Sequence, residues 1–472
     1  MHSILTISLI ALYVYTTTTT ISVLLLENRN PAKSLSWVLM LLFLPFVGLV
    51  LYLIFGQNMR KQKLISQKTF RASSGYVSKS INELNTDLMD YNQLNLVKLL
   101  HKNSDALTYP DNRIEILSDG KSTFEAMFNA IEKATNHIHI EFFIFGNDKI
   151  SNRLRVMLIR KAKEGVRVRM IYDFWGSFFL SRLYLQSLRD AGVYIRPFFP
   201  LRLRLGRSKI NYRNHRKLLI VDGKVGFTGG LNVADRYIFG NTLGHWRDTF
   251  VRFEGAAVHG LQQLFVNDWY FVENKLITDL KYYPTPEKFE KNLVQIVSSG
   301  PDTDWESIMQ GISSAIMSAT KYVYIHTPYF IPNEVVNSSI QMAALSGIDI
   351  RLMIPTRSDS RLSDLCTWSY LGHVMEAGVR VFRYREGFLH SKAIVIDDYV
   401  SIVGSANLDE RSFNQNFEAN AFIYDQKTAL TLKQLFERDL QKSDEIKLSD
   451  WNNRKRKQKM KESFARLFSP LM

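Results

Sequence analysis

Two short motifs hold the residues of this chain that are best suited to catalysis. Each motif reads H-x-K, followed by an aspartate five positions after the lysine and by a later Gly-[Gly or Ser]-x-Asn stretch. The candidate residues are His215, Lys217, Asp222 and Asn232 in the first copy and His390, Lys392, Asp397, Ser405 and Asn407 in the second. Side chains two positions apart on a strand point to the same face, so each histidine projects together with its lysine.

Two imidazoles, two ammonium groups and two carboxamides that meet in one site would suit a phosphate diester. The lysines supply positive charge, and the asparagines supply hydrogen-bond donors to the phosphate oxygens. One histidine can attack phosphorus while neutral, and the other, when protonated, can give its proton to the leaving alkoxide. The sequence contains no H-E-x-x-H, no C-x-x-C and no clustered carboxylates, so we expect neither a metal nor another cofactor.

A neutral histidine nucleophile also needs a carboxylate that orients its second nitrogen. Asp248 and Glu418 follow the two motifs at matching places and are the candidates for this role. Asp222 and Asp397 belong to the motifs, but they lie at the far ends of the predicted strands. We therefore expect these two aspartates to be structural rather than to carry protons.

The chain around the motifs is duplicated, because three pairs of stretches align at offsets of 185, 182 and 186 positions. The pairs are Ala134–Ile140 with Ala319–Ile325, Gly165–Met170 with Gly347–Leu352, and Ala191–Val193 with Ala377–Val379. Each copy reads as helix, strand, helix, strand, which predicts a largely parallel or mixed sheet covered by helices. We expect an α/β fold with two such domains packed as a pseudo-twofold pair.

The first sixty residues predict a membrane anchor of two helices. The uncharged runs Ser3–Leu26 and Ser34–Met59 each exceed the roughly 20 residues that cross a bilayer core. We expect spans at about 4–26 and 36–55, with a possible kink at Pro45. The alternative, a secretory signal peptide followed by a core helix, is disfavoured because the first run has no basic segment before it and no small-residue cleavage site.

The net charge and the composition limit the classes of partner that the chain could bind. The 472-residue chain has 60 Lys and Arg against 45 Asp and Glu, a net charge of +15, which favours either nucleic acid or an acidic membrane. The two apolar runs favour the membrane. Basic residues concentrate after the second run and predict that the body lies on the cytoplasmic side; they are Arg60, Lys61, Lys63, Lys68 and Arg71. The single cysteine, Cys366, excludes a disulfide scaffold.

The expected organisation is a transmembrane hairpin over 1–60, a linker over 61–110, repeats over 111–285 and 286–450, and a basic amphipathic tail over 451–472. The first repeat carries an insertion of about 11 residues that includes Phe198–Leu205. We interpret it either as a loop that touches lipid head groups or as a half-buried strand. The tail either binds an anionic leaflet through Phe464, Leu467 and Phe468 or packs on the body as a solvated helix.

The paired motifs are similar to the signature of the phospholipase D superfamily, over about Asp111–Leu440. This resemblance implies a two-domain α/β/α sandwich with both motifs in one site and a covalent phosphohistidine intermediate. It implies that His215 is the nucleophile and His390 the general acid. It also implies that each carboxylate serves the opposite repeat, so that Glu418 orients His215 and Asp248 orients His390.

Further stretches resemble the family of bacterial cardiolipin synthases: Glu27–Pro31, Leu44–Gly48, Trp246–Thr249, Thr327–Pro332 and Ala465–Leu471. This resemblance implies an enzyme of the bacterial cell membrane that transfers a phosphatidyl group from one phosphatidylglycerol to another and releases glycerol. The alternatives are a hydrolase of the phospholipase D type, transfer to another alcohol, a nuclease of the superfamily, and a lipid-binding scaffold with a decayed site. The two apolar runs disfavour the nuclease, and the completeness of both motifs disfavours the scaffold.

Overall fold

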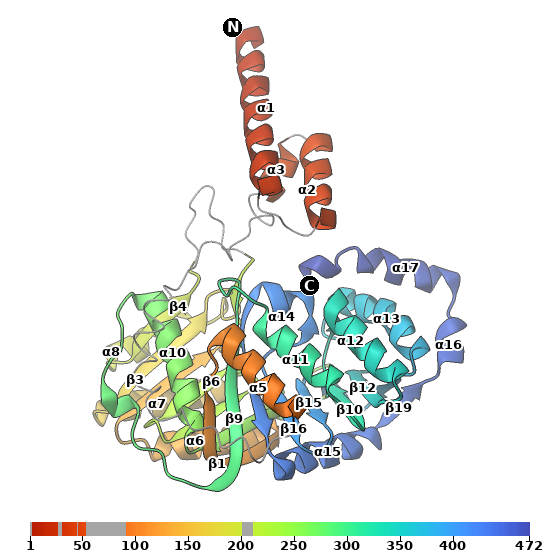
Figure 1. Ribbon diagram of the computed structural model, residues 1–472. Helices are drawn as coiled ribbons and strands as arrows, with labels where there is room; N and C mark the ends of the chain where they lie inside the picture. Colours follow the sequence, from red (N-terminus) through yellow and green to blue (C-terminus); the bar gives the residue numbers. More distant parts are fainter. Residues whose placement is uncertain (1, 27–30, 45, 53–90, 201–210) are drawn as a thin grey trace. The chain divides into compact units, whose positions relative to one another are not determined.

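The computed structural model describes residues 2–26, 31–44, 46–52, 91–200 and 211–472 of the chain (Figure 1). The chain forms two compact units, one made of Met1–Gln62 with Leu201–Tyr212 and the other of Lys63–Pro200 with Arg213–Met472. We call the first the N-terminal unit and the second the body.

The N-terminal unit begins with one long apolar helix, α1 (His2–Leu26). Its segment Thr6–Leu26 is long and apolar enough to cross a bilayer. The threonine run inside it does not interrupt the helix, because the hydroxyls donate to carbonyls one turn back, as from Thr16 to the Leu12 carbonyl at 2.8 Å. The first predicted span is therefore a continuous helix.

In the second predicted span, over about 36–55, residues 45 and 53–55 lie outside the described residues. The described part is interrupted next to Pro45, where the sequence predicts a kink. The structure has two short helices here, α2 (Pro31–Phe43) and α3 (Val47–Leu51). Phe46 between them takes φ 63°, outside the right-handed helical region. A proline removes a backbone donor and clashes with the preceding turn, which accounts for a break next to position 45. Among the described residues, only α1 has the length of a span.

The body contains the predicted duplication. The first repeat consists of β1 (Thr108–Asp119), α6 (Gly120–Glu132), β2 (His137–Phe142), α7 (Lys149–Lys163), β3 (Arg167–Asp173), α8 (Arg182–Asp190), β4 (Tyr194–Phe198), β5 (Arg213–Asn214), β6 (Leu218–Val221), β7 (Val225–Gly229), α9 (Arg236–Phe239), β8 (His245–Glu254) and α10 (Ala257–Glu273). A 3₁₀ turn at Leu280–Tyr282 leads to the second repeat.

The second repeat follows the same order. It consists of β9 (Glu290–Ser299), α11 (Ser307–Met317), β10 (Tyr322–His326), β11 (Phe330–Ile331), α12 (Glu334–Leu345), β12 (Asp349–Pro355), α13 (Arg361–Glu376), β13 (Arg380–Tyr384), β14 (Gly387–Leu389), β15 (Ala393–Ile396), β16 (Val400–Gly404), β17 (Leu408–Asp409), α14 (Glu410–Asn414), β18 (Asn416–Tyr424) and α15 (Gln426–Leu440). The chain ends with β19 (Ser443–Ile446), α16 (Leu448–Asn452), α17 (Arg456–Arg466) and a 3₁₀ turn at Ser469–Leu471.

Each repeat has a mixed sheet with helices on both faces. The first sheet has the strand order β4-β3-β2-β6-β7-β8-β1 and the second the order β9-β18-β16-β15-β10-β12-β13-β19. Alternate residues of β2 face opposite layers: Ile138 and Ile140 pack with α6, α7 and α8, whereas His139 stacks on Phe265 of α10. This arrangement confirms the predicted pair of α/β/α sandwich domains.

The two sheets join through β1. Its first residues, from Thr108, pair with β9, and its later residues, from Arg113, pair with β8. Helix α5 (Tyr91–Ser104) precedes it, and Leu96, Val97 and Leu100 of this helix lie in the core of the second repeat (Figure 1). Residues 61–90 of the linker expected over 61–110 lie outside the described residues, and the remainder contains α5 and the start of β1. The sequence pattern did not predict this helix because few of its residues are apolar and buried.

The sequence is compatible with lipid contact in two segments of the body, the inserted segment of the first repeat and the C-terminal tail. In the inserted segment, Phe198 ends β4 and Phe199 is buried, while the basic half of that segment lies outside the described residues. The tail forms α17, which packs against α13 through Ala465 and Cys366. Its outer face remains exposed at Met460, Phe464 and Leu467.

Candidate active site

The segment before each motif histidine pairs with a strand of the opposite repeat. β5 runs parallel to the start of β18, and the His215 amide donates to the Phe417 carbonyl at 2.9 Å. In the same way β14 runs parallel to the start of β8, and the His390 amide donates to the Arg247 carbonyl at 2.7 Å. Each histidine therefore lies beside the strand that carries the other repeat's acidic residue.

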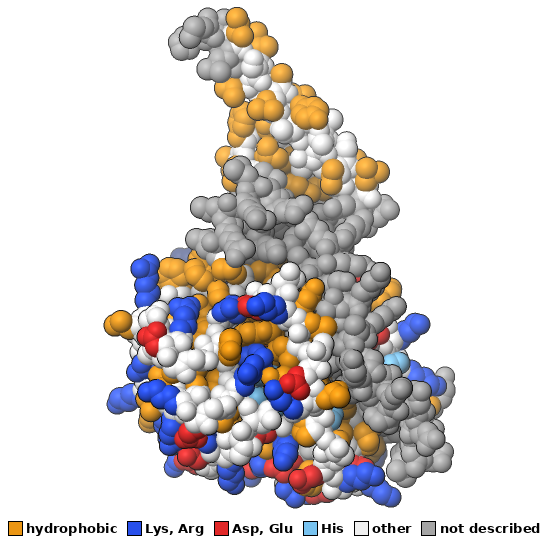
Figure 2. Space-filling view, turned by 90° about the vertical axis from the view of Figure 1, so that its left-hand side faces the viewer, with side chains coloured by type: hydrophobic (Ala, Val, Ile, Leu, Met, Phe, Trp, Pro, Cys, Tyr) orange, Lys and Arg blue, Asp and Glu red, His pale blue; other side chains and the backbone are white. Residues whose placement is uncertain are grey.

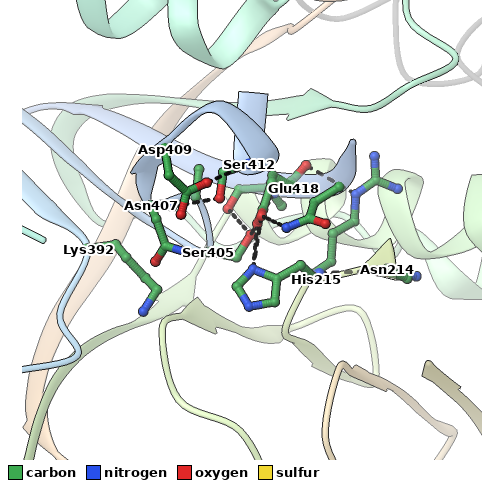
Figure 3. Close-up of polar contacts among 12 residues, drawn as sticks. Asn214, His215, Lys392, Ser405, Asn407, Asp409, Ser412 and Glu418 are labelled. Carbon is green, nitrogen blue, oxygen red and sulfur yellow. Dashed lines mark hydrogen bonds and ion pairs between the residues drawn. The ribbon is translucent and has the colours of Figure 1, made fainter. Parts of the chain in front are cut away.

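The first histidine contacts Glu418 through its Nδ1 atom. His215 Nδ1 lies 2.9 Å from Oε1 and 3.1 Å from Oε2 of Glu418 (Figure 3). The hydroxyl of Ser405 donates to Oε2, and the amide of Asn416 donates to Oε1 at 3.2 Å. The carboxylate is fully buried and held by these three contacts, so it fixes the orientation of the imidazole.

The second histidine contacts Asp248 with fewer supporting groups. His390 Nδ1 lies 2.6 Å from Oδ2 of Asp248, and the Thr249 amide donates to Oδ1 at 2.7 Å. A Cβ atom at Gly230 would lie only 2.1 Å from Asp248 Oδ1. This close approach explains why the first motif has glycine where the second has Ser405.

The two lysines lie at equivalent places. Lys217 Nζ donates to the carbonyl of His215, and Lys392 Nζ donates to the carbonyl of His390 at 2.6 Å. Lys392 Nζ also lies 3.1 Å from His390 Nε2. Burial lowers the pKa of Lys217 to about 7 and that of Lys392 to about 8, so an anion next to them would favour their charged forms.

The charges of the two motifs act on each other. Burial, together with Lys217 and Lys392 and against the effect of Glu418, lowers the pKa of His215 to about 4. Burial, the two lysines and His215 hold the pKa of His390 well below its ordinary value. The pairing of β5 with β18 and of β14 with β8 brings the two motifs together. The charge of each motif lowers the basicity of the histidine in the other, so both imidazoles are neutral at neutral pH.

The two carboxylates differ in charge state. Burial alone would raise the pKa of Glu418, but His215, Lys217 and the Ser405 hydroxyl outweigh it and lower this pKa to about 2. Burial raises the pKa of Asp248 to about 7, although Lys392 and the Thr249 amide oppose the shift. Glu418 is thus a permanent anion, whereas Asp248 lies near the point of proton exchange at neutral pH.

The motif asparagines are not equivalent. Asn232 accepts from the Ile144 amide at 3.1 Å and donates to the Tyr237 hydroxyl at 2.7 Å, so it holds the local framework. Asn407 is anchored by its backbone amide, which donates to Ser412 at 3.2 Å, and its side-chain Oδ1 is buried without a partner (Figure 3). The Asn407 side chain also hydrogen-bonds to the Asp409 carboxyl group, so both expected carboxamides are engaged within the protein and only Oδ1 of Asn407 is left without a partner.

The motif aspartates lie at the opposite ends of β6 and β15 from the lysines. Asp222 takes φ 55° and accepts from the amides of residues 135–137, each at 2.8 Å. Asp397 takes φ 52° and accepts from the equivalent amides of residues 320–322 at 2.5–2.9 Å. Both close the turn beside the first parallel strand of their repeat, which is a structural task.

One group beneath the site was not predicted. Arg216, between His215 and Lys217, forms a buried ion pair with Asp268 of α10, and its Nε donates to the Glu418 carbonyl at 3.1 Å. The equivalent residue of the second motif, Ser391, instead shares a 2.7 Å hydrogen bond with Thr249. Strand alternation could have signalled the need for a partner, because a charged side chain at Arg216 must point away from the histidine and into the body.

Aromatic rings cover both histidines. Phe143 contacts the His215 ring edge-on at 5.0 Å between ring centres. Trp246, Tyr237 and Phe388 surround His390 at 5.2–5.8 Å. Such walls limit the access of water to the reacting groups. Among the residues that the structure describes, no cluster of three or more His, Cys, Asp or Glu side chains is arranged to hold a metal ion.

Two similar α/β domains that share one histidine–lysine site define a protein of the phospholipase D class. A family model described as "Cardiolipin synthase, PLD-like domain" matches residues 127–269 and 312–440, and one described as "Phospholipase_D-nuclease N-terminal" matches residues 11–57. The chain belongs to the cardiolipin synthase family.

Relatives with this name align with nearly the whole chain. The chain is 40% identical over 457 residues to the cardiolipin synthase of Halalkalibacterium halodurans, covering 95% of this chain and 91% of that one. It is 39% identical over 466 residues to the major cardiolipin synthase ClsA of Bacillus subtilis, covering 96% of each chain. The crystal structure of phosphatidylserine synthase from Haemophilus influenzae superposes with a TM-score of 0.61 at 16% identity, covering 80% of this chain and 100% of that one, and so shares the fold.

Proposed function

We propose that the protein is a membrane-bound phosphatidyltransferase that makes cardiolipin and glycerol from two molecules of phosphatidylglycerol. The observation that carries the proposal is the crossed arrangement of two histidine–carboxylate pairs in one site, in a chain that belongs to the cardiolipin synthase family. Both steps exchange one phosphodiester for another covalent phosphorus compound of similar kind, so no nucleotide is required.

In the first step His215 is the nucleophile. The phosphate of the donor lies against the ammonium groups of Lys217 and Lys392, and its negative charge favours protonation of His390. His215 Nε2 forms a bond to phosphorus while the bond from phosphorus to the glycerol head group breaks. His390 gives its proton to the departing oxygen, and glycerol leaves. Glu418 stabilises the positive charge that the phosphorylated imidazole retains.

In the second step His390 accepts a proton instead of donating one. His390, now neutral, takes the proton from a hydroxyl of the second phosphatidylglycerol. The resulting oxygen attacks phosphorus, the nitrogen–phosphorus bond breaks, and cardiolipin forms with His215 restored. Exclusion of water by the aromatic rings around both histidines favours the lipid alcohol over hydrolysis.

The same proposal includes the location of the enzyme. Helix α1 anchors the chain in the bacterial cell membrane, and we propose that the apolar run around α2 and α3 forms a second pass. The basic cluster from Arg60 to Arg71 favours a body on the cytoplasmic face. Reporter fusions at the C-terminus test this orientation. Activity of a fused reporter that functions only outside the cytoplasm would contradict it.

Purified enzyme in nanodiscs that contain phosphatidylglycerol tests the reaction. We expect cardiolipin and glycerol in equal amounts by mass spectrometry, and no product from His215→Ala or His390→Ala variants. Phosphatidic acid as the main product would indicate a hydrolase, and a new diester formed with an added alcohol would indicate a different acceptor. Cleavage of DNA without turnover of lipid would support the nuclease alternative.

A further inference from the structure

The parallel strands define an edge of the body at which the catalytic groups lie. β6 begins beside the carboxyl end of β2, and β15 begins beside the carboxyl end of β10, so Lys217 and Lys392 lie at the same kind of edge in both sheets. We call this the site edge. The loops that follow β2, β3, β10 and β12 leave the sheets there.

On the first repeat, the site edge carries an exposed apolar loop. Residues 174–183, which we call the aromatic loop, include Phe178 at 58%, Phe179 at 87% and Leu183 at 81% exposure. The Trp175 and Phe178 rings stack with 6.0 Å between their centres, so the exposed rings form one cluster. The equivalent loop of the second repeat, residues 356–360, contains only Thr, Arg, Ser and Asp residues.

The aromatic loop is tied directly to the first motif. Oδ1 of Asp173 accepts from the amides of Trp175 and Gly176 at 3.0 and 2.8 Å, and its Oδ2 accepts from the amide of Asn214 at 2.9 Å. One carboxyl group therefore joins the loop to the residue before His215. A Cβ at Gly176 would lie 2.4 Å from the Phe143 carbonyl, so the loop also packs closely on the residue whose ring contacts His215.

On the second repeat, the C-terminal segment supplies a second exposed apolar face. Met460, Phe464 and Leu467 are spaced by four and three residues, lie on one side of α17 and are 68%, 64% and 72% exposed. We call these three residues the C-terminal face. The opposite side of α17 packs through Ala465, and the final carbonyl, of Met472, accepts from the Arg411 amide at 2.7 Å next to Asp409.

Both apolar surfaces have basic flanks. Exposed Arg182 lies in the aromatic loop, and residues 174–189 contain no acid. Beside the C-terminal face lie exposed lysines such as Lys457 and Lys461, and the single acid of residues 454–472, Glu462, is buried against Arg454. The face on the α8 side of the body likewise shows hydrophobic patches with Lys and Arg side chains between them (Figure 2).

We propose that the aromatic loop and the C-terminal face together dock the site edge onto a phospholipid bilayer with anionic head groups. This inference rests on the proposed function, which requires a lipid substrate at the site. Large apolar side chains exposed in clusters mark interaction surfaces, and basic residues around them match the charge of such a bilayer. The two surfaces lie on different repeats, so docking through both would present the shared site to the lipid instead of one half of it.

Fluorescence quenching in nanodiscs tests this docking with the full chain. The only cysteine, Cys366, is buried and donates to the Ala465 carbonyl, and Cys366→Ser preserves a donor and provides a background for single labelling sites. An environment-sensitive dye is attached at Phe179→Cys, at Leu467→Cys or at Leu345→Cys. Leu345 is the matched control, because it is 72% exposed, as Leu467 is, but ends α12 at the edge opposite the site.

We expect brominated lipids in nanodiscs of phosphatidylglycerol and phosphatidylethanolamine to quench the dye at positions 179 and 467 at least about twofold more than at 345. Equal quenching at all three positions, or quenching at only one of the two docking positions, overturns the proposal. If the wild-type enzyme makes no cardiolipin in these nanodiscs but the quenching pattern holds, the proposed function fails while the docking surface stands.

Activity provides a second readout. The double variants Phe178→Ser/Phe179→Ser and Phe464→Ser/Leu467→Ser should lower turnover of bilayer phosphatidylglycerol by about fivefold or more each. Turnover of the water-soluble diester bis(p-nitrophenyl) phosphate should stay within about twofold of wild type, because no variant touches the catalytic groups. Unchanged turnover of the bilayer substrate in both variants, or an equal loss on both substrates, overturns the proposal.

Discussion

The two halves of the site hold their histidines on the same framework but with different chemistry. Beside His215, Glu418 receives three hydrogen bonds and stays ionised, with a pKa lowered to about 2. Beside His390, Asp248 has one backbone donor besides the histidine, and burial raises its pKa to about 7.

This difference matches two different tasks. In the proposed mechanism, the imidazole that becomes bonded to phosphorus carries positive charge through the lifetime of the intermediate, and a permanent anion stabilises that charge. The other imidazole gives a proton in one step and takes one back in the next. A partner carboxyl group with a pKa close to neutral pH suits this exchange. The duplicated framework positions both histidines alike, whereas the groups around the two carboxylates differ.

Removal of either imidazole has the largest expected effect. His215→Ala and His390→Ala should each lower cardiolipin formation by about 10⁴-fold or more without loss of the fold. A radiolabelled phosphatidyl donor with p-nitrophenol in place of glycerol separates the two roles, because this leaving group needs no acid. His390→Ala should then retain the label on protein, and peptide mapping should locate it at His215.

The reverse pattern of labelling would exchange the two roles. Circular dichroism of both variants provides the control for folding. Turnover retained in both alanine variants would contradict the mechanism altogether.

The carboxylates should differ in sensitivity. Glu418→Gln should lower turnover by about 10³-fold, because it removes the charge that stabilises the phosphorylated histidine. The loss of turnover in Asp248→Asn should be about tenfold to a hundredfold smaller than that in Glu418→Gln. The reason is that the pKa of Asp248, at about 7, leaves much of this carboxyl group uncharged at pH 7. Steady-state rates on phosphatidylglycerol in nanodiscs measure both, and equal losses would contradict the assigned difference.

The middle residues of the two motifs should differ in their effect on stability. Arg216→Met leaves the buried Asp268 without its partner and should lower the free energy of unfolding by about 3–5 kcal/mol. Ser391→Ala breaks one neutral hydrogen bond with Thr249 and should cost about 1 kcal/mol. Denaturant titration of the detergent-solubilised chain compares the two, with Lys427→Gln at an exposed ion pair as control.

The Gly230 and Ser405 positions offer a smaller comparison. Gly230→Ala places a Cβ against Asp248 Oδ1 and should lower turnover by about 10²-fold by displacing the carboxylate from His390. Ser405→Ala removes one donor to Glu418, which keeps two others, and should lower turnover by about tenfold or less. A larger loss in Ser405→Ala than in Gly230→Ala would show that the hydroxyl contacts the substrate.

The pH dependence of kcat/KM on a soluble diester should be bell-shaped. His215 attacks only when neutral, so activity is lost as the pH falls through its pKa of about 4. The lysines act only when charged, so activity is lost as the pH rises through their pKa values of about 7 and 8. A rate that stays constant up to pH 10 would contradict the electrostatic role of the lysines.

Much of this site could be predicted from sequence because its residues recur at matching positions. The spacing of His215 and Lys217 predicted that their side chains project together, and the second copy made a chance pattern unlikely. The structure places both residues in the connection between β5 and β6 and not on a strand. The exchange of carboxylates followed only from family resemblance, because the pairing of β5 with β18 joins segments about 200 residues apart and leaves no local pattern.

Other features depended on contacts that sequence spacing does not reveal. The partner of Arg216 is on α10, and the Tyr237 hydroxyl occupies one donor of Asn232. Helix α5 looked like part of a linker because only Leu96, Val97 and Leu100 reach the core.

The exchange of β5 and β14 between repeats also determines when the enzyme can first become active. A ribosome that has synthesised the whole first repeat has produced His215 without Glu418, whose codon lies about 200 positions further on. The nascent chain therefore carries no complete nucleophile during most of its translation. A chain truncated between the repeats would have no phosphatidyltransferase activity. The two parts could gain activity only by assembling with each other.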